Sequence, residues 1–285
     1  MQKRVLAIHD ISCAGRCSLT VALPILSAAG LETTVLPTAV LSTHTGGFSG
    51  YTYRDLTEDI MPIAEHWKSL NLRFDAIYSG YLGSFEQLDL IGRLFDMFRN
   101  EDTVVLVDPV MADNGVLYKG FDPDFPKGMA GLCGKADIIV PNLTEASFML
   151  GEPYDDACAY DRGKVESMLK RLTKLGPKRA VLTGVSFEKG KLGAAAYDSE
   201  SDSFSCYFRE EVEGYYHGTG DVFGSALLAA CMNGKRLSET IKLAVDFTVG
   251  SIKRTSAAMT EPRYGVDFEN ELPNLINTLR LEDGR

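Results

Sequence analysis

The feature that most constrains this chain is a regular alternation of short apolar runs with longer, helix-like segments. The apolar runs occupy residues 5–8, 34–41, 76–79, 104–107, 138–140 and 180–183. Continuous β-branched and aliphatic runs are typical of strands that are covered on both faces, as in a parallel sheet. The segments between them, 19–29, 55–70, 85–99 and 163–175, are each long enough for a crossover helix. Pro24 interrupts the first of these patterns, so we expect a kink or a displaced start in that helix.

The pattern changes after residue 183. Segments 192–197 and 204–208 are predicted to be strands joined by the polar turn 198–202, which indicates an antiparallel meander at the sheet edge. Three helices are expected to close the chain, over 222–232, 237–255 and 270–279. No repeat or linker-like stretch divides the sequence. We therefore expect one doubly wound α/β domain over residues 1–285, with ligands bound beyond the carboxyl ends of its strands.

The charge balance and the cysteines narrow the class of protein. The chain carries 29 Lys and Arg against 39 Asp and Glu, a formal charge of −10. This argues against nucleic acid, whose binding depends on cationic contacts to phosphate. The apolar run 5–8 is too short for a signal-peptide core, and no stretch approaches the ~20 apolar residues of a membrane span. The six cysteines form no CxxC pair, so we expect reduced thiols in a cytoplasmic protein with no membrane partner.

The strongest chemical signal is the glycine turn His217-Gly218-Thr219-Gly220-Asp221, directly followed by an apolar helix pattern. Free amides at a helix start, backed by the positive end of the helix dipole, suit a transferring phosphoryl group. Asp221 could take a proton from an attacking hydroxyl, and the dipole is expected to lower its pKa and keep it ionised. The alternative is an ordinary glycine turn in which Asp221 only caps the helix. The spacing matches neither a dinucleotide fingerprint nor a P-loop.

Two further polar segments follow predicted strands. Asp108 stands at the end of one strand, and Asn142 and Glu145 follow the next. Carboxylates and an amide that converge at neighbouring strand ends would suit Mg²⁺ beside nucleotide phosphates. The alternative is that Asn142 and Thr144 only cap a helix that contains Glu145.

Two loops are candidates for a substrate pocket. Thr45 and Gly46, next to His44, offer a hydroxyl and free backbone, and Tyr81 could flank a planar ring. The alternatives are a loop with a solvent-facing histidine, and a tyrosine that packs on a neighbouring helix.

Taken in order along nearly the whole chain, these segments resemble the pyridoxal kinase family of the ribokinase superfamily, and its bacterial pyridoxamine kinases in particular. The resemblance is carried by segments 7–12, 42–46, 79–84, 108–111, 141–145, 181–183 and 218–221. It implies a ribokinase-like fold, with helices on both faces of a mostly parallel sheet and no separate lid domain, and a homodimer. It also implies phosphorylation of the 5′-hydroxymethyl group of pyridoxal, pyridoxamine or pyridoxine with ATP and Mg²⁺. Whether a monovalent cation also binds stays open.

The resemblance implies roles for single residues. Asp221 matches the catalytic base, and the turn Gly218, Thr219 and Gly220 matches its anion hole. Asp108 and Glu145 match positions near Mg²⁺ and the ATP phosphates. The other nucleotide contacts expected are Val140, Asn142, Thr183, Gly218 and Gly220. The substrate contacts expected are Asp10, Ser12, Thr45, Gly46, Tyr81 and Asp221. Segment 209–217 falls where the family has a mobile flap over ATP.

Two positions depart from the family pattern. Asp10 stands where many pyridoxal kinases carry a serine facing the pyridine ring, with Ser12 nearby. An acid there is expected to favour an amine-bearing or protonated ring, and so pyridoxamine as a substrate. Thr183 stands where some members have a lysine.

Two other functions stay open on the sequence alone. One is a hydroxymethylpyrimidine kinase of thiamine synthesis, a sister branch with the same glycine turn. The other is a non-catalytic vitamin B6 or nucleotide-binding protein. The segments around Thr45 and Tyr81 favour vitamin B6 over the pyrimidine, and the set of Asp108, Glu145 and Asp221 favours an enzyme over a binding protein.

Overall fold

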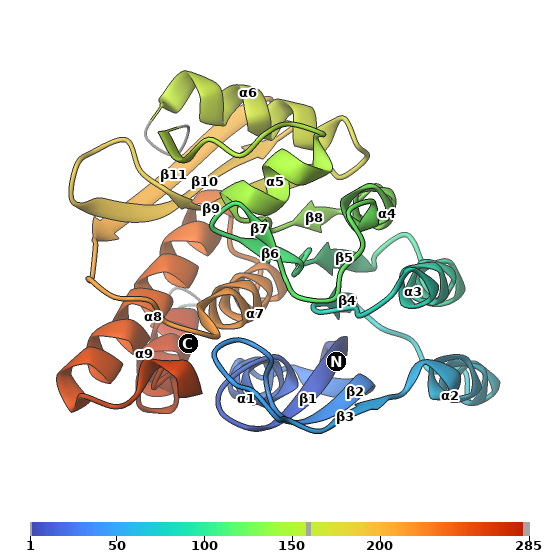
Figure 1. Ribbon diagram of the computed structural model, residues 1–285. Coiled ribbons are helices and arrows are strands. Elements are labelled where there is room, and N and C mark those ends of the chain that lie inside the picture. Colours follow the sequence, from blue (N-terminus) through green and yellow to red (C-terminus); the bar gives the residue numbers. More distant parts are fainter. Residues whose placement is uncertain (1, 158–160, 282–285) are drawn as a thin grey trace.

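A nine-stranded sheet forms the centre of the structure, a computed structural model that describes residues 2–157 and 161–281 (Figure 1). Its strand order is β11-β10-β9-β8-β5-β4-β1-β2-β3. Neighbouring strands from β9 to β2 are parallel, while β10, β11 and β3 add antiparallel strands at the two edges. The strands are β1 (Arg4–Ala14), β2 (Glu32–Thr43), β3 (Tyr53–Asp55), β4 (Ala76–Ser79), β5 (Val104–Val107), β8 (Ile138–Ile139), β9 (Arg179–Val185), β10 (Lys191–Asp198) and β11 (Ser203–Glu210). A separate hairpin pairs β6 (Ala112–Asp113) with β7 (Val116–Leu117).

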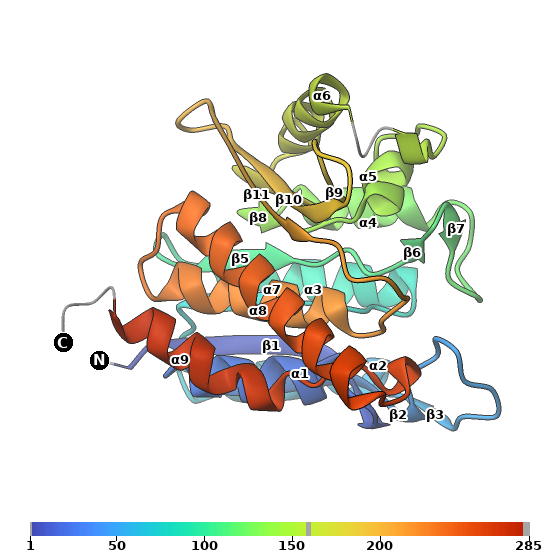
Figure 2. The ribbon, with the colours of Figure 1, turned by 90° about the vertical axis from the view of Figure 1, so that its left-hand side faces the viewer.

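Helices cover both faces of the sheet, because its central strands are apolar on both sides. One face packs against α2 (Thr57–Ser69), α3 (Phe85–Phe98), α4 (Phe125–Cys133), α5 (Leu143–Met149) and α6 (Arg162–Thr173). The other packs against α1 (Leu19–Ala28), α7 (Thr219–Met232), α8 (Leu237–Ala258) and α9 (Leu272–Leu281), which Figure 2 shows from their own side. The predicted fold class, a doubly wound and mostly parallel sheet, is confirmed. The described residues form no separate lid domain, and a single domain over 1–285 stays a prediction.

Most predicted elements are present, with shifted ends. Strands 76–79 and 104–107 have the predicted bounds, and the edge meander of β10 and β11 is confirmed. Helix α1 begins at Leu19, as predicted, and runs through Pro24, so its start is not displaced. One expectation about a helix start is wrong. Helix α7 begins at Thr219 rather than at residue 222, so the glycine turn is itself the first helical turn. Strand β3, the β6–β7 hairpin and α4 were not predicted.

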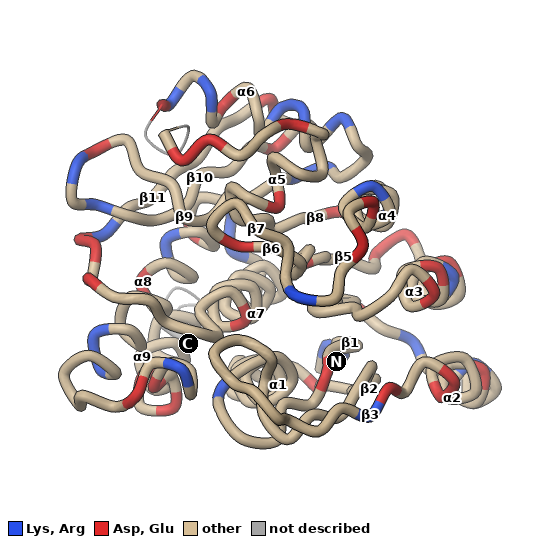
Figure 3. Tube along the Cα trace, viewed as in Figure 1, with Lys and Arg blue, Asp and Glu red and all other residues tan. Residues whose placement is uncertain are grey.

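Most charged residues lie on the outside of this framework, and Asp10, Asp108 and Glu145 are among the buried exceptions. Acidic and basic residues are interspersed along the outer helices α2, α3 and α6 (Figure 3). Among the described residues, no helix is both long enough and apolar enough to cross a membrane. The five described cysteines are unpaired, and Cys158 lies outside the described residues.

Candidate active site

Strand β2 follows β1 on one side of the sheet, whereas β4, β5, β8 and β9 follow in order on the other side. The strand order therefore reverses between β1 and β4, which pair with each other. Ligand sites of doubly wound sheets lie at such a point, beyond the carboxyl ends of the strands. Asp10 is there on β1, next to an irregularity in the pairing with β2, and Tyr81 follows β4. A bulge re-aims the side chain beside it. The topology therefore directs Asp10 and Tyr81 to the place where a ligand is expected.

A cavity of ≈ 620 Å³ opens beyond these strand ends. Its wall contains five of the six expected substrate contacts: Asp10 from β1, Thr45 and Gly46 from the loop after β2, Tyr81 from the loop after β4, and Asp221 from α7. Gly46 packs closely against His217, since a Cβ there would lie 2.8 Å from Cε1 of the imidazole ring. The sixth, Ser12, is fully buried behind the wall, where its hydroxyl donates to Oδ2 of Asp10 at 3.0 Å.

A second cavity of ≈ 350 Å³ lies beyond the ends of β5, β8 and β9. Its wall contains all the expected nucleotide contacts: Asp108, Val140, Asn142, Glu145, Thr183, Gly218 and Gly220. Residues of the expected flap between 211 and 217 also line this second cavity, whereas residues 209–210 belong to β11. Asp221 lines both cavities. The two halves of the predicted site are thus neighbouring cavities that share a stretch of wall, and Asp221 is part of it.

The start of α7 presents free amides to this meeting point. Gly218 has φ 72° and precedes the helix, and a Cβ there would collide with the carbonyl oxygen of Arg16. The first intrahelical bond runs from the amide of Val222 to the carbonyl of Gly218. The amides of Thr219, Gly220 and Asp221 therefore have no acceptor within the helix. Such amides form an anion site.

The electrostatics of Asp221 differ from the expectation. The surrounding protein removes water from its carboxylate and raises its pKa to about 7, with the nearby Asp10 adding to the shift. A 2.8 Å hydrogen bond from the amide of Ser18 acts in the opposite direction. The expected lowering by the helix dipole is wrong in sign, because desolvation outweighs the favourable groups.

Asp108 and Glu145 form a buried acidic pair in the second cavity. Burial and the charges of Glu145 and Asp221 raise the pKa of Asp108 well above its usual range. Burial raises the pKa of Glu145 to about 8. Glu145 accepts bonds from the amides of Met111 (3.1 Å) and Asn142 (2.9 Å), whereas no donor from the described residues reaches the Asp108 carboxylate.

This acidic pair fits a hard cation. An unpaired, buried carboxylate next to another is unfavourable unless a positive charge joins it. Among the described residues, no group of three His, Cys, Asp or Glu side chains could hold a metal ion by itself. Mg²⁺ commonly binds through one or two carboxylates together with water and substrate phosphates, so the donor set suits Mg²⁺ that arrives with a phosphorylated ligand.

The structure bears out one of the structural alternatives in part. Asn142 caps α5, since its side chain accepts from the amide of Glu145 at 2.9 Å and the Glu145 carboxylate bonds back. Thr144 lies inside the helix, where its hydroxyl accepts from the amide of Gly115 at 2.9 Å. Its amide group also donates to the carbonyl of Ala112 at 2.8 Å. Asn142 therefore lines the second cavity as part of a capping box that fixes Glu145.

Several lining residues were missed from the sequence. Cys17 and Ser18 line the first cavity beside Asp221, and Tyr118 and Tyr215 line both. Tyr215 lies within the expected flap 209–217, whereas Cys17, Ser18 and Tyr118 lie outside any motif, and only Gly15 hinted at a turn before Cys17.

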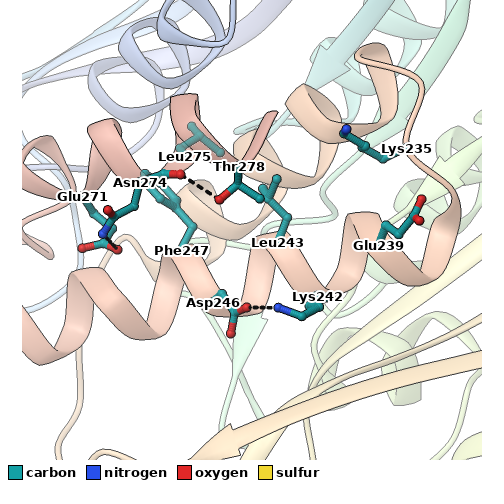
Figure 4. Close-up of a pocket in the computed structure, with 10 residues that line it drawn as sticks. All are labelled: Lys235, Glu239, Lys242, Leu243, Asp246, Phe247, Glu271, Asn274, Leu275 and Thr278. Atoms are coloured by element: carbon teal, nitrogen blue, oxygen red, sulfur yellow. Dashed lines mark hydrogen bonds and ion pairs between the residues drawn. The ribbon is translucent and has the colours of Figure 1, made fainter. Parts of the chain in front are cut away.

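A third cavity is a poor candidate. It measures ≈ 150 Å³ and lies between α8 and α9 (Figure 4). Its charged groups are satisfied within the protein, since Lys242 pairs with Asp246 at 2.6 Å and Glu271 pairs with Arg254 at 2.6 Å and accepts from Asn274 at 2.6 Å. We therefore place the active site at the first two cavities.

The sequence matches the model of the phosphomethylpyrimidine kinase family over residues 25–265. The chain belongs to this family. Pyridoxal kinases are among its relatives. The pyridoxal kinase of Lactobacillus plantarum is 31% identical, with a TM-score of 0.89, and the match covers 100% of this chain and 99% of that one.

Two further family members add detail. A Bacteroides thetaiotaomicron protein named for phosphomethylpyrimidine kinase is 37% identical, with a TM-score of 0.92, over 96% of this chain and 94% of that one. Its orthorhombic crystal form was solved with pyridoxal. The pyridoxal kinase of Actinobacillus pleuropneumoniae is 32% identical over 182 residues, which span 56% of each chain. The expected membership of the pyridoxal kinase family is confirmed.

Proposed function

We propose that this protein is a vitamin B6 kinase, which transfers the γ-phosphoryl group of ATP to the 5′-hydroxymethyl group of pyridoxal, pyridoxamine or pyridoxine. The observation that supports it most directly is the pair of cavities that meet at Asp221. A transfer between two small molecules needs one site for each and a shared boundary where the phosphoryl group crosses. The relatives named pyridoxal kinase supply the identity of the alcohol.

The second cavity is the proposed nucleotide site. Asp108 and Glu145 would hold Mg²⁺ beside the phosphates, and the free amides of Thr219 and Gly220 would bind phosphate oxygens. Val140, Asn142 and Thr183 lie farther along the same wall and would contact the rest of the nucleotide. When bound, Mg²⁺ would neutralise charge that develops on the phosphate oxygens.

The first cavity is the proposed vitamer site. Tyr81 would flank the pyridine ring, and Thr45 and Gly46 would contact its substituents. Asp10 is buried, and burial raises its pKa, while the hydroxyls of Ser18 and Ser12 stabilise its charged form. An acid at this place would pair with a cationic amine or a protonated ring nitrogen, so we propose pyridoxamine as a good substrate.

The proposed mechanism follows from these positions. Asp221 accepts the proton of the vitamer hydroxyl as its oxygen forms a bond to the γ-phosphorus. The bond from that phosphorus to the bridging oxygen of ADP breaks, and its electron pair leaves with ADP. Positioning and charge stabilisation dominate such transfers. A pKa of about 7 gives Asp221 more basicity than an ordinary aspartate, which suits a general base near neutral pH.

The first test is ATP turnover by the purified protein with Mg²⁺ and pyridoxal, pyridoxamine, pyridoxine or hydroxymethylpyrimidine offered separately. We expect turnover with at least one vitamer and none with ATP alone. Turnover with the pyrimidine only would contradict the proposed alcohol and retain the mechanism. No turnover with all four would contradict the proposed function.

Hydroxymethylpyrimidine phosphorylation is the second candidate. The family model that matches the chain carries the name of a pyrimidine kinase, and both alcohols are flat heteroaromatic rings. The relatives named pyridoxal kinase, one of them matched over the whole chain, favour the vitamer. A homodimer in the cytoplasm and the absence of nucleic-acid partners stay predictions.

A further inference from the structure

One strained residue lies in the wall of the first cavity. Ser18 has φ 56° and ψ −128°, dihedrals of the first central position of a type II′ turn, where glycine is the usual residue. A side chain makes this conformation unfavourable. Ser18 is only 8% exposed, so packing and hydrogen bonds hold it in place. Strain of this kind persists where the surroundings over-determine a conformation, often at a functional site.

The backbone N–H of Ser18 points at Asp221, the proposed base. The Ser18 amide donates a 2.8 Å hydrogen bond to Oδ2 of Asp221, which lies 203 residues later in the chain. Within the described residues, no donor is directed at the other oxygen, Oδ1. The Ser18 hydroxyl also stabilises the charged form of Asp10. Ser18 therefore acts on two of the three acids that line the first cavity, Asp221 and Asp10.

The turn around Ser18 is anchored at both ends. The amide of Arg16 donates to the carbonyl of Tyr264 at 2.8 Å. The hydroxyl of Thr20 lies 2.8 Å from the carbonyl oxygen of Cys17. The carbonyl of Ser18 accepts from the amides of the first turn of α1. With its neighbours fixed in this way, the Ser18 amide cannot rotate away from Asp221.

We propose that Ser18 is a positioning residue for the transfer. Its amide holds Oδ2 of Asp221, so that Oδ1 faces the vitamer hydroxyl and accepts its proton. Its hydroxyl stabilises the charged form of Asp10, the acid proposed to contact the vitamer ring. The unfavourable backbone conformation of Ser18 is what directs its amide at the base. This inference rests on the proposed function, because it takes Asp221 as the base.

Three substitutions test it in the full-length protein. Ser18→Val places a β-branched residue where φ is positive, so the peptide has to turn and the bond to Asp221 is lost. We expect kcat to fall by about tenfold or more, as for the loss of a hydrogen bond to a charged group. Ser18→Gly keeps the amide and fits the turn, so it should lose much less. Asn71→Val is the matched control, because Asn71 also has φ 56° but is exposed and follows α2; it should lower the melting temperature and not kcat.

A double-mutant cycle separates positioning from stability. If Ser18 acts through Asp221, Ser18→Val should cause little further loss of kcat in an Asp221→Asn background. Equal losses in both backgrounds, or wild-type kcat in Ser18→Val, would overturn the proposal.

A measurement without turnover covers the case in which Ser18→Val does not fold or no alcohol is phosphorylated. The Ser18 amide proton should resonate downfield in the NMR spectrum of the wild-type protein and move upfield in Asp221→Ala. An unchanged shift would overturn the pairing. Absence of turnover together with the expected shift would contradict the proposed function and leave the pairing intact.

Discussion

The hydroxyl of Tyr215 donates a 2.9 Å hydrogen bond to Oδ2 of Asp113. Tyr215 belongs to the connection between β11 and α7, and Asp113 to the β6–β7 hairpin. Both residues line both cavities. The bond therefore ties the connection to the hairpin across the place where the two cavities meet at Asp221.

Tyr215→Phe removes this hydrogen bond and keeps the aromatic ring. We expect KM to rise by about 3- to 10-fold for ATP and for the vitamer together, because a typical hydrogen bond contributes about 1 kcal/mol. Steady-state kinetics with each substrate varied in turn measures this. Phe85→Leu, at an exposed aromatic on α3, serves as a control. A rise in only one KM would show that the tie serves a single cavity.

Asp221→Asn keeps the size of the side chain and removes the base. We expect turnover to fall by at least ~100-fold, the lower range for general-base catalysis, while the circular dichroism spectrum and ATP binding by calorimetry stay the same. Asp96→Asn, on an exposed ion pair with Lys135, controls for the loss of one negative charge. Near-normal turnover in Asp221→Asn would remove Asp221 from this role.

The pKa of Asp221 predicts a pH dependence. Only the ionised carboxylate accepts a proton, and its pKa in the folded protein is about 7. The value of kcat/KM, which reports on the free enzyme, should therefore rise as the pH increases through about 7 and level off above it. A flat profile between pH 5.5 and pH 8.5, measured at saturating Mg²⁺, would be inconsistent with Asp221 as the titrating base.

The same shifts predict how stability changes with pH when no ligand is present. Asp221 and Glu145 have pKa values of about 7 and about 8 in the folded protein, above their values of 3.8 and 4.5 in the unfolded chain. The folded state therefore binds these protons more tightly. Their contribution to stability is complete below about pH 4 and is lost as the pH rises through 7 to 8. Between pH 5 and pH 8.5 the urea midpoint should fall more for the wild type than for Asp221→Asn.

Asp108→Asn should have opposite effects on thermal stability and on turnover. The unpartnered carboxylate of Asp108 is unfavourable in its buried position, since burial and two neighbouring acids raise its pKa. Replacing it with a neutral amide should raise the melting temperature of the ligand-free protein at pH 8 and lower turnover with MgATP. Thermal unfolding with and without Mg²⁺ provides the measurement. A lower melting temperature in the variant would mean that a donor or cation already satisfies this carboxylate.

Asp10→Ser tests the choice among vitamers. We expect the preference for pyridoxamine to fall relative to pyridoxal and pyridoxine, because the partner for a cationic group is lost. The ratios of kcat/KM for the three vitamers measure this directly. An identical order in wild type and variant would contradict the role of Asp10.

The sequence predicted the central sheet well because its strands carry their own signal. Residues 104–107 are apolar at every position and residues 76–79 at all but Ser79, and both runs have the predicted bounds. Strand β3 has no such signal, since its three residues are exposed and it exists through pairing with β2. Helix α4 is short and has a proline in its first turn, so its pattern was too brief to detect.

The residues expected at the site line the two cavities or lie next to them, whereas the electrostatics of Asp221 differ from the expectation. The glycine turn and the strand ends are visible as motifs, and they come together as expected. The pKa of Asp221 depends on how much water reaches the carboxylate, which is a property of the folded cavity and not of the helix that carries it. Ser18 could not be found because its role depends on a backbone angle and on a contact across most of the chain.

The common wall at Asp221 also affects how this site could diverge. Apart from this shared region, the first cavity draws its wall from β1, from the loops after β1, β2 and β4 and from the chain of the β6–β7 hairpin, and the second from the ends of β5, β8 and β9 and from the chain around residue 212. Substitutions at Thr45 or Tyr81 can therefore reshape the acceptor space while the donor space stays untouched. Recognition of the two reactants is modular, and a lineage could exchange one alcohol for another without rebuilding its use of the phosphoryl donor.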